Sequence, residues 1–414
     1  MLSLRNRVIA LCILVNMLDG FDILAMAYAA PALAKAWTIP PQQLGLVFSI
    51  GLAGMMLGSM AIGLLADRTG RRPMILACLT LGTLGMLSAA NSADLSQLGI
   101  ARFITGLAIG GMLPCINSMV AEYALPHWRS MAVSLMQAGF AIGASVGGFV
   151  SVLLLKVWGW SGVFACGAIL TGLLLPLVFL GMPESFAFLS GSPERDAEYR
   201  ALLGRLGQTV SPSPPADSEA GQGLRALADH AAPLIMIFAI WFLCVMSFYF
   251  LNSWVPKILA DGGLSEGQAV AGGAMLTAGG IISALVLGWI SLKRSLVGIV
   301  ALATAGSAAM TLLFGQIAGG AMPLLSAAFL LGVLTNATQI GIYAVIPGLF
   351  PASVRAGATG LAIGMGRLGS VLGPWLAGIM LAAGWSAPWL FAAMAMPYLC
   401  AAILMLPLQR WLRY

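Results

Sequence analysis

A dozen apolar runs, each about 20 residues long, fill almost the whole of this chain. With 60% hydrophobic and only 8% charged residues among 414, the chain has too little polar surface to cover a soluble fold. In lipid each segment must satisfy its own backbone hydrogen bonds, so such runs fold as helices. The pattern predicts an all-α membrane protein with twelve transmembrane helices. The runs begin near Val8, Leu44, Pro73, Leu95, Met131, Gly162, Pro233, Gly267, Leu296, Pro323, Ala356 and Pro388.

One long polar stretch divides these runs into six and six. We predict an N-terminal six-helix bundle at 1–183, a cytoplasmic central loop at 184–230 with a surface helix near 194–206, and a C-terminal six-helix bundle at 231–414. At an offset of 226, Arg129 and Gly143 correspond to Arg355 and Gly369. Such a repeat is typical of two-bundle carriers, although glycine-rich helices also resemble one another by composition.

The placement of Lys and Arg predicts that both termini are cytoplasmic. With that orientation, fifteen of these residues fall in inside loops and three in outside loops. The inside set is Arg5, Arg7, Arg68, Arg71, Arg72, Arg129, Arg195, Arg200, Arg205, Arg225, Lys293, Arg294, Arg355, Arg410 and Arg413; the outside set is Lys35, Lys156 and Lys257. The net charge of +6 then reflects topology, and no nucleic-acid partner is expected.

The cysteines and histidines do not suggest metal binding or catalysis. All six cysteines lie in apolar runs, and the two histidines, His127 and His230, fall in predicted loops. We therefore expect no enzyme activity, metal or organic cofactor. The first apolar run shows no cleavable signal and is long enough to span the membrane.

Two acids, Asp19 and Asp22, lie in the middle of the first apolar run. A carboxylate at bilayer depth is unfavourable unless it faces partners or water, so it is a functional candidate. Their spacing of three puts both on about one helix face. At ~1.5 Å per residue, Asp22 lies roughly 21 Å from the inner end of its span and Arg102 roughly 10 Å inside the outer end of the fourth, at nearly the same depth.

We therefore predict an Asp22–Arg102 interaction, which holds Asp22 ionised when the proton is absent and weakens on protonation. A static structural ion pair is the alternative. Asn16 is expected to bond Asp19 or to lie on the same face.

A second buried cation, Arg367, lies roughly 17 Å into the eleventh span, near the depth of Asp19. Its repeat-related residue is Ala141, so the scaffold as such does not require an arginine. A guanidinium suits bidentate capture of a carboxylate, which makes Arg367 a candidate for substrate binding. A structural salt bridge or hydrogen bonds to carbonyl groups are the alternatives.

Between the second and third runs lies Gly63-Leu64-Leu65-Ala66-Asp67-Arg68-Thr69-Gly70-Arg71-Arg72. It resembles the loop signature of the major facilitator superfamily, in which this loop is a gate latch between the two bundles. We expect Gly63 to permit close packing and Gly70 a tight turn. Asp67 can meet a cation or a helix N-terminus, with Glu122 and Arg129 as expected partners of the loop. These charges could instead only set topology. The second-half loop at 288–294 lacks the acid, which makes a symmetric second latch doubtful.

Three further segments resemble the aromatic acid:proton symporter family: Leu18 to Asp22, Phe248 to Lys257, and Gly341 through Gly369. This resemblance implies proton-driven uptake of a benzoate-, hydroxybenzoate- or muconate-type acid across a bacterial inner membrane. It also implies that Asp19 and Asp22 are needed for transport. Polar and aromatic residues of the predicted cavity are candidates for substrate binding. They are Asn117, Gln137, Tyr249, Asn252, Trp254, Asn336, Gln339 and Tyr343, with Trp254 a membrane-interface anchor in the alternative interpretation.

The resulting hypothesis is alternating-access symport of a small carboxylate with protons, by a carrier that works as a monomer in membrane lipid. A sugar-acid or other organic anion symporter, or an efflux antiporter of the same superfamily, is the alternative. A membrane sensor is disfavoured by the short tails, and an embedded enzyme by the lack of a catalytic constellation.

Overall fold

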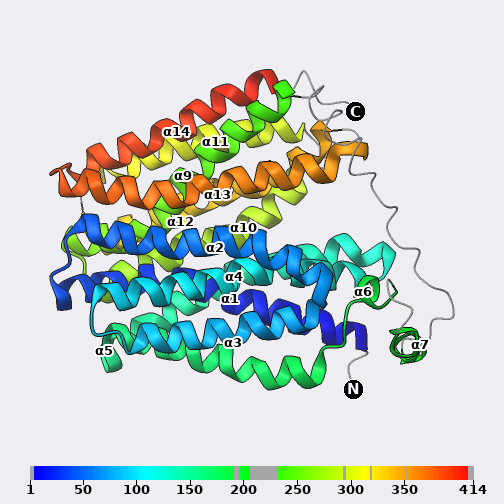
Figure 1. Ribbon diagram of the computed structural model, residues 1–414. Helices are drawn as coiled ribbons and strands as arrows, with labels where there is room; N and C mark the ends of the chain where they lie inside the picture. The colour runs from blue at the N-terminus through cyan, green and yellow to red at the C-terminus, as the bar shows by residue number, and fades with distance from the viewer. Residues whose placement is uncertain are drawn as a thin grey trace. The chain divides into compact units, whose positions relative to one another are not determined.

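The computed structural model describes residues 4–190, 195–205, 231–291, 295–317, 319–350 and 352–408 (Figure 1). Within these ranges the secondary structure is helical, without a strand, which agrees with the all-α prediction. The first-half helices are α1 (Leu4–Trp37), α2 (Pro41–Thr69), α3 (Arg71–Ala90), α4 (Leu95–Tyr123), η1 (Pro126–Trp128), α5 (Arg129–Gly181), α6 (Phe186–Ser190) and α7 (Asp196–Arg205). The second-half helices are α9 (Ala231–Asp261), α10 (Glu266–Ser291), α11 (Leu296–Phe314), α12 (Ala321–Val345), η3 (Ile346–Leu349), α13 (Ala352–Ala382) and α14 (Ala387–Leu408).

Eleven helices in the described part of the chain are long and apolar enough to cross a membrane. The longest, α5, has 53 residues and would extend about 80 Å, far more than a bilayer core of about 30 Å. Gly159 interrupts it with φ 65° and ψ −161°, values that lie outside the helical region. The interruption falls between the predicted fifth and sixth spans, so α5 comprises both segments.

The other predicted spans begin within a few residues of the observed helices, and the predicted surface helix corresponds to α7. The short helix α6 was not predicted. Residues 206–230, Lys293, Arg294 and the last six residues lie outside the described part, so predictions about them stay predictions.

The helices form two compact units that do not follow the chain order. Unit 1 contains 1–23, 53–144 and 164–217, and unit 2 contains 24–52, 145–163 and 218–414. The helices α1, α2 and α5 are thus each divided between the two units. These units are groups of contacting residues, so they leave the predicted bundle boundaries at 183 and 231 as a prediction.

Glycines set the helix crossings inside unit 1. A Cβ added to Gly20 would lie 2.2 Å from the Phe140 carbonyl oxygen, and one added to Gly143 would lie 1.8 Å from the Met17 oxygen. In the same way, a Cβ on Gly58 would lie 2.1 Å from the Leu107 oxygen. Backbone therefore touches backbone where α1 crosses α5 and where α2 crosses α4, as small residues permit in membrane helices.

Unit 2 repeats this packing. A Cβ on Gly369 would lie 2.4 Å from the Phe242 oxygen, where α13 crosses α9, and one on Gly332 would lie 1.9 Å from the Leu276 oxygen, where α12 crosses α10. Gly369 is the residue that the 226-residue offset matches to Gly143. The internal repeat is therefore present in the helix contacts as well as in the composition.

Candidate functional site

The two acids of α1 are buried inside unit 1. Asp19 is 4% exposed and Asp22 is 2% exposed, and each is close enough for its charge to act on the other. The glycine crossing of α1 with α5 at Gly20 fixes the helix between them. A pair of buried acids on one helix turn can hold a proton more readily than two charges.

Arg102 lies beside Asp22, as its depth predicted, but it does not bond the carboxylate. Its Nη2 donates to the main-chain oxygens of Asp22 at 3.1 Å and Ile23 at 3.4 Å. Its guanidinium lies 5.8 Å from the centroid of the Phe164 ring. The positive charge of Arg102 therefore faces Asp22, while the arginine is held by backbone groups that do not titrate.

The carboxyl groups keep free acceptor positions. Oδ1 of Asp22 and Oδ2 of Asp19 have no hydrogen-bond partner among the described residues. Oδ2 of Asp22 accepts from Thr171 at 3.2 Å. Asn16 donates to the Met136 oxygen at 2.6 Å, so the amide nitrogen expected near Asp19 bonds α5. Buried oxygens without donors are sites where an added proton is favourable.

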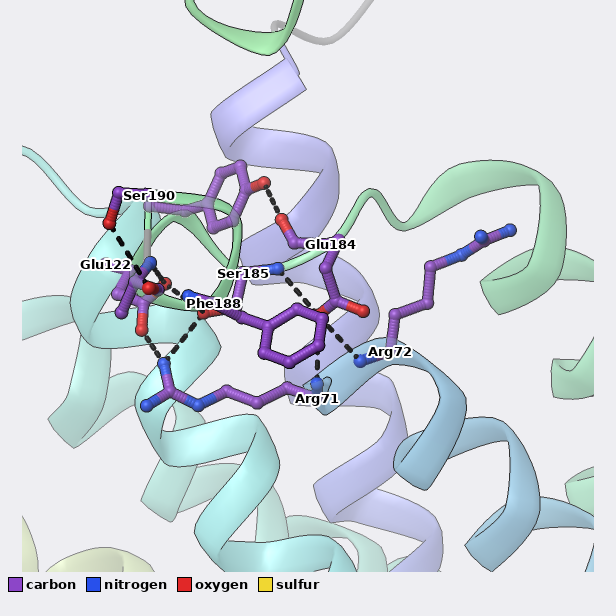
Figure 2. A network of polar contacts seen from close by, with 9 residues as sticks. Arg71, Arg72, Glu122, Glu184, Ser185, Phe188 and Ser190 are labelled. Atoms are coloured by element: carbon purple, nitrogen blue, oxygen red, sulfur yellow. Dashed lines mark hydrogen bonds and ion pairs between the residues drawn. The ribbon is translucent and has the colours of Figure 1, made fainter. Parts of the chain in front are cut away.

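The loop between α2 and α3 is organised by Glu184, a residue that the sequence did not identify. Its Oε1 accepts from the backbone N–H groups of Arg71 at 2.9 Å and Arg72 at 3.1 Å, at the N-terminus of α3 (Figure 2). A carboxylate there satisfies unpaired helix donors and the helix dipole. Gly70 has φ 102°, and a Cβ on it would lie 2.5 Å from Glu184 Oε2, so the predicted tight turn requires glycine.

Arg71 joins this turn to the end of α4. Its guanidinium forms an ion pair with Glu122, an expected partner of the loop, and donates to Ser185 Oγ at 3.0 Å. Ser185 in turn donates to Glu122 at 2.7 Å (Figure 2). Arg72 donates to the Phe179 oxygen at 2.6 Å. The loop is thus tied to α4 and to the start of α6 within unit 1.

The other loop residues make fewer contacts than predicted. No described atom lies within 4 Å of a Cβ added to Gly63, so the expected close packing at Gly63 is wrong. The side chains of Asp67, Arg68 and Arg129 are exposed, and the described residues give none of them an ion pair within 4 Å. The charge of Asp67 nevertheless acts on the Arg71 guanidinium, a cation of the kind expected for it. Glu122 is therefore the expected partner that the structure places on the loop, and Arg129 is not.

In unit 2, Arg367 lies near the aromatic residue Tyr343. It is half-buried on α13, and no acidic group of the described residues pairs with it. Its charge acts on the hydroxyl of Tyr343, which also lies near Tyr249. The Tyr343 ring packs edge-on against Trp241, with centroids 4.6 Å apart. A cation without a counterion beside aromatic rings suits an aromatic carboxylate.

Three of the remaining substrate candidates use their amide nitrogens in bonds to the backbone. The amide nitrogens of Gln339, Asn252 and Asn336 donate to the oxygens of Cys244, Phe248 and Gly332 respectively. Their amide oxygens stay available as acceptors. Asn117 is half-buried and Gln137 exposed, and both belong to unit 1.

Trp254 is not a membrane-interface anchor. It is 1% exposed, donates to the Pro374 oxygen at 2.9 Å and packs against Phe48.

Three residues that contact the candidate residues were not predicted from the sequence: Thr171, Glu184 and Trp241. Glu184 carries the one available signal, since it is an acid directly after the sixth apolar run. Thr171 and Trp241 are ordinary residues of apolar helices, and nothing in their local sequence marks them.

Comparison with known proteins is consistent with this arrangement. The family model of the Major Facilitator Superfamily matches residues 10–327. The 4-hydroxybenzoate transporter PcaK of Pseudomonas aeruginosa is 30% identical over 89% of this chain and 85% of its own length. The 3-(3-hydroxy-phenyl)propionate transporter of Escherichia coli is 31% identical over 89% of this chain and 85% of its own. The gallate transporter of Pseudomonas putida is 29% identical over 88% and 83%.

Solved structures share the fold at lower identity. A bacterial homologue of the lysosomal transporter Spinster, in an inward-facing conformation, gives a TM-score of 0.78 at 16% identity, covering 100% of this chain and 98% of that chain. A D-xylose-proton symporter gives 0.74 at 16% identity, covering 99% and 98%. At this identity the likeness concerns the fold alone.

Proposed function

The chain belongs to the Major Facilitator Superfamily, and from that premise we propose that it imports a small aromatic carboxylic acid together with protons. It is a transporter and not an enzyme. The relatives carry 4-hydroxybenzoate, gallate and 3-(3-hydroxy-phenyl)propionate, all of which join a hydroxylated ring to a carboxylate. We therefore assign the substrate to the class of acids that have one aromatic ring and one carboxylate.

The observation that carries this proposal is the pair of buried acids on α1. Asp19 and Asp22 are buried beside Arg102, and each keeps a carboxyl oxygen without a donor in the described structure. A structural ion pair would instead saturate both carboxylates. Carboxyl oxygens that can accept a proton are what coupling of transport to protons requires.

Arg367 supports the choice of an anion as the substrate. The half-buried guanidinium offers a fork of donors for a carboxylate. It lies near Tyr343, whose hydroxyl is also near Tyr249 and whose ring packs against Trp241. An exporter of cations or neutral compounds would be disfavoured by this charge.

In the transport cycle that we propose, two six-helix bundles, 1–183 and 231–414, alternately expose a midplane site to the two sides. The twelve predicted spans would lie in a bacterial inner membrane with both termini on the cytoplasmic side, the orientation that the distribution of Lys and Arg favours. The fold needs one chain, and protons are the coupling ion.

The test is accumulation of labelled 4-hydroxybenzoate in proteoliposomes with an imposed proton gradient. Asp19→Asn and Asp22→Asn keep the side-chain shape but cannot release a proton, so each should abolish uphill accumulation. Lys156→Gln, a change at an exposed residue of α5 outside the loop between α2 and α3 and outside the acid pair, is the control for assembly. Accumulation at the wild-type level in both asparagine variants would rule out the coupling role. Transport of a cationic dye in place of the acid would favour the efflux alternative.

A further inference from the structure

Thr171 faces Asp22 from the second segment of α5, with its side chain 2% exposed. Its Oγ1 lies 3.2 Å from Asp22 Oδ2 and 2.8 Å from the Gly167 carbonyl oxygen. A threonine hydroxyl has one hydrogen and two lone pairs, so it can donate fully to one of these oxygens at a time. Both acceptors are within reach without movement of the backbone.

We infer that Thr171 is a positioning residue for Asp22, whose one hydroxyl hydrogen stabilises the ionised and the protonated carboxyl in turn. The inference rests on the proposed function, in which Asp22 exchanges a proton during transport. It assigns to a hydroxyl on α5 a role in the proton step.

In the ionised state, the hydroxyl donates to Asp22 Oδ2. Gly167 loses little, because its carbonyl oxygen also accepts the backbone N–H of the following helix turn. When H⁺ binds at Oδ2, the new O–H donates to Oγ1 of Thr171, and the threonine hydrogen rotates to the Gly167 oxygen. When Asp22 releases its proton, the Thr171 hydrogen rotates back to Asp22 Oδ2. One proton therefore enters and one leaves in each cycle. Each state keeps a complete set of hydrogen bonds between these groups.

No other described side chain hydrogen-bonds the Asp22 carboxyl. The titratable groups that face it are Asp19 on the same helix, Arg102 on α4 and Cys166 on α5, while α3 contributes the thioether of Met86. Arg102 bonds main-chain oxygens, so it supplies charge and no donor to the carboxylate. The hydroxyl of Thr171 is therefore the group that can follow a change in protonation.

Gly167 makes room for this arrangement. A Cβ at that position would lie 2.8 Å from Asp22 Oδ1 and 2.3 Å from the Met86 methyl carbon. The glycine therefore leaves Oδ1 unobstructed one helix turn from Thr171, so the carboxyl keeps its place against α5.

The direct test is infrared titration of the purified carrier, with the spectrum of Asp22→Asn subtracted to isolate the Asp22 carboxyl. Thr171→Val replaces the hydroxyl by a methyl group of similar size. A charge-assisted bond is stronger than a neutral one, so its loss should move the midpoint of the Asp22 titration about one pH unit to higher pH. The carbonyl band of the protonated acid should also move to higher frequency, because it no longer donates to Oγ1.

Matched variants separate this role from simple packing. Thr171→Ser keeps the hydroxyl and should restore the wild-type midpoint and band. Thr105→Val is the control: Thr105 is fully buried in unit 1, and among the described residues its hydroxyl bonds only the Ala101 oxygen of its own helix. Thr171→Ala gives the same measurement if the valine variant does not fold.

The inference is overturned if Thr171→Val or Thr171→Ala titrates like the wild type, or if the serine variant behaves like the valine variant. Transport measurements distinguish failure of the Thr171 inference from failure of the proposed function. Loss of proton-driven accumulation in Asp22→Asn with an unchanged Thr171→Val titration contradicts the role of Thr171 alone. An Asp22→Asn carrier that still accumulates acid contradicts the coupling role itself, whatever the titration shows.

Discussion

At the scale of single residues, two buried or half-buried arginines lie in different surroundings, Arg102 in unit 1 and Arg367 in unit 2. Arg102 is bonded to main-chain oxygens and stays in place whichever way Asp22 titrates. Arg367 has no acidic partner in the described residues and is half-buried. Depth in the membrane led to the expected Asp22–Arg102 interaction, but depth could not show that Arg102 bonds carbonyl groups. We therefore propose that the proton step takes place beside Arg102 and that Arg367 binds the substrate carboxylate.

A prediction follows for Arg367. Arg367→Gln removes the charge and should weaken binding of 4-hydroxybenzoate about 10- to 100-fold, the loss expected for charge-assisted hydrogen bonds. Arg367→Lys keeps the charge but loses the planar fork, so its affinity should fall between those of the wild type and the glutamine variant. Binding is measured by the ligand-induced rise in melting temperature of the purified carrier. The uncharged amide of the same acid is the control ligand, and an equal loss for acid and amide would contradict carboxylate capture.

At the scale of helices, glycine contacts position the acids. Gly143 touches the backbone of α1 at Met17, two residues before Asp19, whereas a Cβ on Gly63 meets no described atom within 4 Å. The two positions therefore form a matched pair: both are helical glycines of unit 1, and one is crowded while the other is open. From the sequence, we expected Gly63 to permit close packing because it begins the loop motif at 63–72.

We accordingly expect different effects of alanine at these two positions. Gly143→Ala must push α1 and α5 apart and should lower the free energy of unfolding by about 1–3 kcal/mol or more. Gly63→Ala should leave it near the wild-type value or slightly higher, since alanine favours helix. Thermal unfolding in detergent measures both, and equal melting temperatures would contradict the packing argument.

The number and position of the helices were predictable, while the contacts between them were not. Apolar length sets each span, and even the join inside α5 at Gly159 falls between two predicted runs. By contrast, the Thr171–Asp22 bond joins residues 149 apart and the Arg71–Ser185 bond joins residues 114 apart. No local pattern encodes which faces of two apolar helices meet, because lipid-facing and buried positions carry the same residue types.

At the scale of the whole molecule, unit 2 joins parts of both sequence halves. Within it, Ser145 and Thr277 hydroxyls lie 3.1 Å apart, Ser49 donates to the Val371 oxygen at 2.7 Å, and Lys35 pairs with Glu266. If the arginine-rich loops are cytoplasmic, these contacts lie toward the outer side. In a carrier that rocks one bundle against the other, they must break whenever the site opens outward.

Cross-linking tests this requirement. In a variant without the six native cysteines, Ser145→Cys with Thr277→Cys places two thiols where hydroxyls now meet, a separation suited to a disulfide. Oxidation should abolish most counterflow of labelled 4-hydroxybenzoate, and reductant should restore it, because the bond would tie together residues of the two proposed bundles. The matched control is Ser307→Cys with Thr338→Cys, whose hydroxyls are also 3.1 Å apart but join α11 to α12 within the second half. That cross-link should leave counterflow unchanged, since a bundle that moves as a rigid body never separates the two helices. Full activity with the first disulfide formed, or equal inhibition by both, would contradict alternating access through motion of these bundles.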